Sequence, residues 1–163
     1  MAWAKNGTPE TKSSSGDTDD NISDLTAYKF NQSMEHFFIN TGMIVGVRFD
    51  ADSGSVYAVR NSRNGGTDAT AGSQAQINDD VTSLSGTEDR FHITYMCNIS
   101  GEETLMISFG VGHGTAGATN DPDRVEAVGK DAGTTQFIQM GRYRFSGSGD
   151  FDTNSNNSIL GTD

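Results

Sequence analysis

From residue 43 onward, apolar side chains recur at every second position, in short runs separated by turn residues. Residues 43–49 and 55–60 form the first two runs, and the segment 50–54 between them, Asp-Ala-Asp-Ser-Gly, has the composition of a hairpin turn. Further runs follow at 90–97, 105–111, 124–130, 136–140, 143–145 and 158–161. Side chains on a strand alternate between two faces, so this period predicts β-strands, and no βαβ alternation is present. We expect residues 43–163 to form an antiparallel, jelly-roll-like β-sandwich, in a chain that is mainly all-β.

The composition is compatible with that prediction. Only 33% of the 163 residues are hydrophobic, while 20 are glycine. A β-sandwich takes apolar side chains from the inward face of each strand, and its loops are rich in small and polar residues. The length corresponds to one domain that can bury a core without disulfides. The single cysteine, Cys97, lies in an apolar run, and we expect it to be a small buried core residue.

Residues 22–42 have a different period, which predicts one amphipathic helix. Ser23 or Asp24 could cap its first turn, and Gly42 suits the left-handed position after its last. The spacing i, i+4, i+7 and i+8 would gather four apolar side chains into one stripe: Phe30, Met34, Phe37 and Phe38. Such a stripe needs cover, either from the sheet of the same domain or from another chain.

Residues 1–21 are polar and rich in Gly, Ser, Thr and Asp, so they predict a flexible assembly arm. Trp3 is the only tryptophan of the chain and lies in this segment. Together with the stripe of Phe30, Met34, Phe37 and Phe38, it is our candidate for self-association. These residues predict a homo-oligomer.

The net charge of −11 restricts the partners of the chain. Binding to nucleic acid requires clustered Lys and Arg, and docking on an anionic membrane surface requires the same. No stretch is apolar for long enough to cross a membrane. We therefore expect no direct contact with nucleic acid and no membrane association, and an acidic surface that keeps a concentrated protein soluble.

Three stretches resemble jelly-roll structural proteins of tailed-virus virions, including those of marine archaeal and bacterial viruses. They are residues 22–32 (ISDLTAYKFNQ), residues 56–66 (VYAVRNSRNGG), and residues 147–156 (GSGDFDTNSN) leading into 159–161 (ILG). Leu160 stands where the family usually has an aromatic residue in the last strand. The resemblance implies a capsid, decoration, tail or fibre component, with other virion proteins as partners and the virion or extracellular space as its location.

The residues indicate no catalytic site and no required cofactor. His36, His92 and His113 lie in a predicted helix, a predicted strand and a glycine-rich loop, and none has the neighbours of a nucleophile and base pair. The series Gly110, Gly112 and Gly114 lacks the lysine and helix of a phosphate-binding loop. We therefore expect a protein that is not an enzyme.

Two ligand hypotheses stay open at this point. Asp150, Asp152 and Asn154 alternate oxygen-bearing side chains and are candidate calcium ligands, although a solvated turn has the same pattern. A carbohydrate-binding, lectin-like attachment module is the alternative function, because jelly rolls serve as lectin scaffolds. Its aromatic candidates, Tyr57, Tyr95 and Tyr143, all fall within predicted strands.

Overall fold

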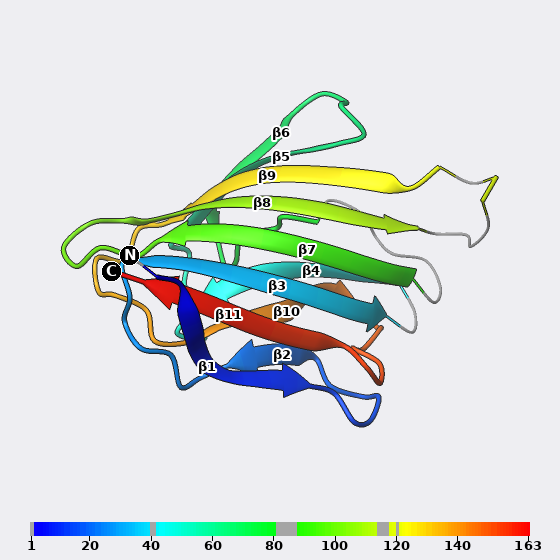
Figure 1. The fold of residues 1–163 in the computed structure, drawn as a ribbon. Helices are drawn as coiled ribbons and strands as arrows, with labels where there is room; N and C mark the ends of the chain where they lie inside the picture. The colour runs from blue at the N-terminus through cyan, green and yellow to red at the C-terminus, as the bar shows by residue number, and fades with distance from the viewer. Residues whose placement is uncertain (1, 40–41, 81–87, 114–117, 120) are drawn as a thin grey trace.

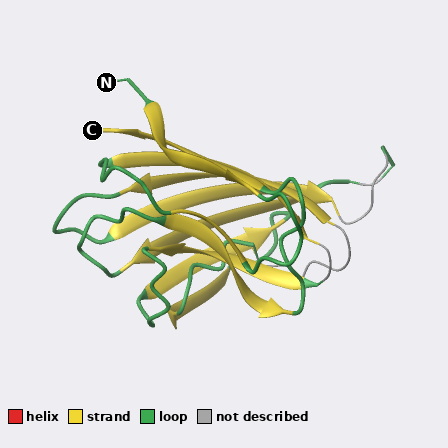
Figure 2. Ribbon diagram, turned by 90° about the horizontal axis from the view of Figure 1, so that it is seen from below, coloured by secondary structure: helices red, strands yellow, loops and turns green. Residues whose placement is uncertain are grey.

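The computed structural model describes residues 2–39, 42–80, 88–113, 118–119 and 121–163, and the side chains of residues 88 and 113 are not described. The described residues contain no helix, and all strand pairs are antiparallel (Figures 1 and 2). The strands are β1 (Ala4–Thr11), β2 (Asp19–Ile22), β3 (Phe30–Ile39), β4 (Met43–Phe49), β5 (Tyr57–Arg63), β6 (Ala69–Gln74), β7 (Glu88–Cys97), β8 (Thr104–His113), β9 (Asp123–Asp131), β10 (Met140–Gly147) and β11 (Asn156–Thr162).

These strands form two sheets. The large sheet has eight strands in the order β1-β11-β3-β7-β8-β9-β5-β6, and the small sheet has three in the order β2-β10-β4. The pair β7 and β8 therefore lies at the middle of the large sheet, with three strands on either side. In Figure 1 the small sheet lies behind and below the large one.

The core lies between the two sheets, so the architecture is sandwich-like. Val47 and Phe49 come from the small sheet, and Met96 and Met106 come from the large one. Phe137, from the segment before β10, stacks on Phe49 with ring centroids 4.5 Å apart. Fully burying a side chain of this size contributes about 1.5–3 kcal/mol, so this shared cluster is what holds the layers together.

The predicted helix over residues 22–42 is wrong. Residues 30–39 form strand β3, with burial alternating at every second residue. Phe30, Met34 and Phe38 point outward, whereas Phe37 is fully buried beside Phe151. Phe30, Met34 and Phe38 share one face of the strand, but together with Phe37 they also fit one stripe of a helix. The inward side of the strand carries polar residues, so the apolar positions alone do not reveal its alternation.

The β4–β5 hairpin was also an incorrect prediction. A turn follows Phe49, with positive φ at Asp50 and Ala51, but the two strands enter different sheets. β4 pairs with β10, and β5 pairs with β9 and β6. The link across the layers is Tyr57, whose hydroxyl accepts a hydrogen bond from the backbone N–H of Phe49 at 3.0 Å.

The segment predicted as an arm contributes a strand to each sheet. β1 pairs with β11, and β2 pairs with β10. Asn6 is buried and donates a hydrogen bond to the side-chain oxygen of Asn31 at 2.8 Å. Gly7 has a φ of 73°, and a Cβ there would stand 2.6 Å from Ile22. This close approach explains a glycine at that position.

Candidate interaction surface and the charges behind it

The large sheet presents an apolar surface on the side away from the small sheet. Strand β8 contributes most to it, because Leu105, Ile107, Phe109 and Val111 are each 44–53% exposed. We call the following set the apolar face: Phe30, Met34, Phe38, Phe91, Ile93, Tyr95, Cys97, Leu105, Ile107, Phe109, Val111 and Val128. Soluble monomers rarely leave a contiguous apolar area of this extent uncovered.

Strand register joins these side chains into rows across the sheet. Directly opposite residues share a face, so Gln32, Tyr95, Ile107 and Val128 form one row. Met34, Ile93, Phe109 and Glu126 form the next row, in the same order of strands. The apolar face is therefore continuous over β3, β7, β8 and β9.

The inward sides of β3, β7 and β8 are largely polar, which reverses the usual polarity of a sandwich strand. Ser33 and Glu35 are buried on β3, Arg90, His92 and Thr94 on β7, and Ser108 on β8. The strands at the centre of the large sheet thus bury charges and expose hydrophobic side chains.

The buried charges meet in one cluster between the sheets. Arg142 of β10 forms ion pairs with Glu35 and Asp79. The ring of His92 lies between two carboxylates, with Nδ1 3.7 Å from Asp79 Oδ2 and Nε2 3.7 Å from Asp80 Oδ2. Arg90 Nε lies 3.3 Å from the same Asp80 oxygen. We call these the ionic cluster: Glu35, Asp79, Asp80, Arg90, His92 and Arg142.

The charges of the ionic cluster balance only when His92 is protonated, because its carboxylates are then matched by its cations. Burial and the nearby Arg142 charge disfavour the imidazolium, but the Asp79 and Asp80 carboxylates, each 3.7 Å from a ring nitrogen, outweigh them and raise the pKa of His92. Burial alone would raise the pKa of Asp79, yet the Arg142 charge holds it well below its usual range. The arrangement therefore favours the protonated form of His92.

Two glycines on β8 make room for these cations. Gly110 lies directly opposite His92, and Gly112 directly opposite Arg90. A Cβ at Gly110 would overlap the imidazole ring, and one at Gly112 would overlap the guanidinium group of Arg90. Both positions lie in strand β8, so Gly112 belongs to a strand and not to the glycine-rich loop predicted around His113. Gly114 lies outside the described residues.

Every member of the ionic cluster is at most 1% exposed, and Asp80 lines a small hollow of about 220 Å³ together with Asn61 and Phe145. The described parts of the chain do not contain three or more His, Cys, Asp or Glu side chains placed to hold a metal ion. They also contain no helix that could span a membrane. The surface with access to partners is the apolar face.

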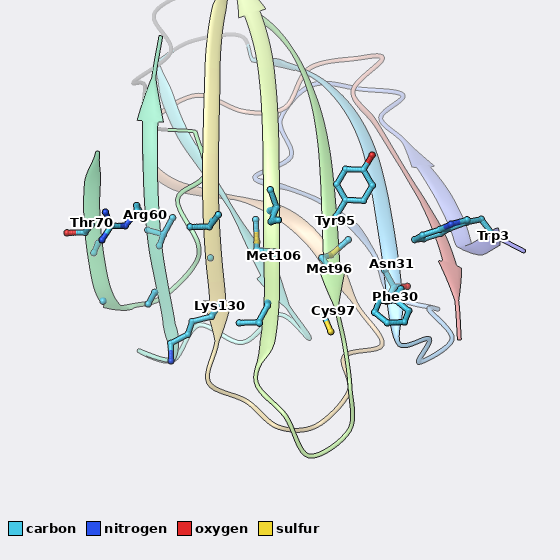
Figure 3. Close-up of a pocket in the computed structure, with 18 residues that line it drawn as sticks. Trp3, Phe30, Asn31, Arg60, Thr70, Tyr95, Met96, Cys97, Met106 and Lys130 are labelled. Atoms are coloured by element: carbon cyan, nitrogen blue, oxygen red, sulfur yellow. The ribbon is translucent and has the colours of Figure 1, made fainter. Parts of the chain in front are cut away.

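One end of the apolar face is hollowed, with a volume of about 900 Å³ (Figure 3). Trp3 stands at the margin formed by β1, and Arg60 and Thr70 lie at the opposite margin on β5 and β6. Tyr95 and Leu105 contribute to the floor between them. The margin at β5 and β6 is lined by small residues, Ala58, Ala71 and Gly72.

The structure brings most of the predicted self-association residues to this face. Trp3 is 46% exposed and Phe30 is 38% exposed, and both line the hollow. Met34 and Phe38 are outward and half-buried, whereas Phe37 belongs to the core. Cys97, which we expected in the core, is half-buried and lines the same hollow.

The candidate calcium residues lie in the turn before β11. Arg144 donates to Asp150 Oδ1 at 3.4 Å, and the backbone N–H of Thr153 donates to Asp152 Oδ1 at 2.7 Å. Asn154 adopts a left-handed conformation with a φ of 74°. One oxygen of each carboxylate is thus engaged with the protein itself, which favours the alternative of a turn without calcium.

Of the tyrosines considered for glycan binding, only Tyr95 is presented to solvent. Tyr57 is fully buried, and Tyr143 is 8% exposed. Burial raises the pKa of Tyr143, and Gln139 donates a hydrogen bond to its hydroxyl at 3.0 Å. Tyr57 and Tyr143 are structural residues.

Our sequence reasoning missed the outward residues of β8 and the ionic cluster. A signal for both was present, because Arg90, His92 and Thr94 alternate with Phe91, Ile93 and Tyr95. Asp79 and Asp80 are adjacent in the sequence, as in many turns, and both are fully buried. The inward side of an alternating strand can be assigned only when the position of the second sheet is known.

The fold and the face define an all-β protein of two antiparallel sheets with an exposed apolar sheet surface. No protein-family model matches the chain, and no curated protein matches it. An alginate lyase from Klebsiella pneumoniae aligns at 8% identity with a TM-score of 0.20, covering 83% of this chain. The chain spans 60% of the length of that lyase. A similarity this low carries no argument about fold or activity.

Proposed function

We propose that the chain is a non-enzymatic, self-associating structural subunit that uses the apolar face as its interface. The observation that carries this proposal is the reversed polarity of β3, β7 and β8. Most of their hydrophobic side chains point away from the sandwich core, although Phe37, Met96 and Met106 point into it. The buried charges of these strands lie on the inward side. Covering a large apolar side chain contributes about 1.5–3 kcal/mol, so a face with many of them strongly favours association.

The charge distribution supports the same proposal. The chain carries a net charge of −11, which should keep copies apart. On the outward sides of β5 and β9, however, lie the cations Arg60, Arg124 and Lys130. On the described strands of this region two carboxylates point outward, Glu126 on β9 and Asp89 on β7. Each of the cations forms an ion pair with a carboxylate, Asp68, Glu126 or Glu103, which offsets negative charge beside the apolar face.

The family resemblance indicates where such an assembly occurs. The three stretches at residues 22–32, 56–66 and 147–161 support a jelly-roll-like subunit of a virus particle or a similar extracellular assembly. An acidic, loop-rich surface around an apolar interface suits a subunit that is packed at high concentration. Other particle proteins would then be further partners.

The test is the mass of the purified chain in solution as a function of concentration. Sedimentation velocity should show an oligomer at tens of micromolar that dissociates on dilution. Ile107→Glu places a charge at the centre of the apolar face and should give a monomer with unchanged circular dichroism. Ile138→Glu is the matched control, because Ile138 is 54% exposed and lies between β9 and β10 rather than on the large sheet. A wild-type chain that is monomeric up to millimolar concentration would contradict the proposal.

A carbohydrate-binding module is the second candidate, and the hollow favours it. Trp3, Phe30 and Tyr95 supply aromatic surfaces there, and Arg60 supplies a polar group beside them. Sugars stack on aromatic rings, whereas seven of the twelve residues of the apolar face are not aromatic, so self-association is the stronger hypothesis. Binding of the isolated chain to a glycan array, lost in Tyr95→Ala, would support the second candidate.

A further inference from the structure

We propose that two copies of this chain pack their large sheets face to face about a twofold axis, with Trp3 of each copy seated on the β5–β6 margin of the other. This inference rests on the proposed function and specifies the partner and the contact. It starts from the strand order. Four strands, β1, β11, β3 and β7, lie on one side of the sheet's midline, and four, β8, β9, β5 and β6, lie on the other.

A twofold axis that runs along the strands, midway between β7 and β8, superposes the two halves. It places β7 of one copy over β8 of the other, β3 over β9, β11 over β5, and β1 over β6. Rows are preserved, so Tyr95 faces Ile107 and Ile93 faces Phe109 of the other copy. The apolar centre of each face is then covered by the apolar centre of the other, as a closed, self-complementary interface requires.

The charged side chains fit this arrangement. Using the row positions, Lys130 faces the ring of Phe30, which is a favourable contact for a cation. Glu126 faces Met34, and Arg60 faces Leu160. Arg124 faces His36, whose Nε2 contacts the carboxylate of Asp89 on the neighbouring strand. None of these pairings brings two carboxylates together.

The margins are complementary in shape. Trp3 is a large, exposed side chain at the β1 margin, and its row meets the opposite margin at Ala58 and Gly72. That margin carries small residues, and a Cβ at Gly72 would meet no atom within 4 Å. Figure 3 shows Trp3 and Thr70 at opposite ends of the hollow, at a similar height along the strands. The twofold axis brings each Trp3 onto the open margin of the other copy, beside Arg60.

The area is sufficient for a stable pair. Eight strands about 4.8 Å apart and seven residues of about 3.3 Å each cover roughly 900 Å² per copy, or roughly 1,800 Å² for both. Stable, specific interfaces bury about 1,200–2,000 Å². A buried tryptophan near a polar margin is a typical energetic anchor of such an interface.

The test compares dimer dissociation constants of the full chain by sedimentation equilibrium. Trp3→Ala should weaken the dimer by about 10- to 30-fold, because Trp3 anchors both ends of the interface. Gly72→Phe fills the open margin and should weaken it to a similar extent. The double variant should be no weaker than either single one, because both remove the same contact. Phe145→Ala is the matched control, an exposed aromatic on β10 of the small sheet.

Fluorescence gives a second readout, because Trp3 is the only tryptophan. Its emission should shift to the blue as the dimer forms, and this shift should be absent in Gly72→Phe. Circular dichroism confirms that each variant folds. If the chain associates but the Trp3 and Gly72 variants keep the wild-type dissociation constant, the arrangement is overturned while the proposed function stands. A chain that never associates, or one that binds glycans as a monomer, overturns both.

Discussion

His92 on β7 lies directly opposite Gly110 on β8, and a Cβ at position 110 would occupy the space of its imidazole ring. The residue pair shows how the interior of this sandwich accommodates a charge. A glycine in a central strand normally weakens the strand, because it has no side chain to pack. Here the missing side chain leaves room for the imidazole ring of His92 between Asp79 and Asp80.

The first prediction concerns that space. Gly110→Ala should destabilise the fold by about 1–3 kcal/mol, because the added methyl group forces the ring of His92 out of its position. Thermal melting checks it. Gly72→Ala is the control, since position 72 is open and the change should be nearly neutral. Equal melting temperatures for the two variants would show that the cluster adapts freely.

The second prediction concerns the pH dependence of stability. The pKa of His92 is raised above its ordinary value of 6.5. Its contribution to stability is therefore fully present below pH 6.5 and is lost as the pH rises through the folded-state pKa. Chemical denaturation of the wild type should show a free energy of unfolding that falls as the pH rises above 6.5. His92→Gln should be less stable at pH 6 and should show a smaller fall, and an unchanged slope would show that another group titrates.

The third prediction concerns Asp20, a carboxyl group that burial makes costly to ionise. Asp20 is 1% exposed, and within the described residues its Oδ1 has no hydrogen-bond partner. Burial raises its pKa from 3.8 to about 7. Folding therefore favours the protonated carboxyl group. The contribution of Asp20 to stability is fully present below pH 3.8 and is lost as the pH rises through about 7.

Asp20→Asn removes that ionisation. We expect the variant to be more stable than the wild type at pH 8, on the order of 2 kcal/mol, and the difference to shrink toward pH 4. Denaturant titrations at the two pH values measure it. Asp24→Asn is a control, because Asp24 is exposed and accepts hydrogen bonds from Thr8 that hold its pKa low. A destabilised Asp20→Asn variant at pH 8 would argue that the carboxylate is stabilised in the fold.

The fourth prediction concerns calcium at the turn before β11. Arg144 and the Thr153 backbone occupy oxygens of Asp150 and Asp152, so we expect the melting temperature to be the same in millimolar calcium and in chelator. A ligand that binds the native state raises the melting temperature by mass action. A rise with calcium that disappears in Asp152→Ala would instead establish the calcium site.

Sequence patterns alone predicted the all-β class and the antiparallel strands, because alternation over residues 43–49, 90–97 and 105–111 is a local property of the chain. They also predicted that the side chains of Trp3, Phe30, Phe37 and Phe38 need to be covered by another part of the protein or by another chain. Local pattern failed at residues 30–39, where apolar spacing fits a helix and a strand equally well. The polar residues between, such as Ser33 and Glu35, gave no reason to prefer the strand.

Tertiary structure decided which side of each strand is inside. Glu35 can be buried only because Arg142, more than one hundred positions later in the chain, arrives on the facing sheet to form an ion pair with it. The same holds for His92, which needs both Asp79 and Gly110. A buried charge is costly unless it is paired, so the polar side of these strands turned inward only where partners of opposite charge met it. The hydrophobic side was thereby left to form the outer face of the large sheet.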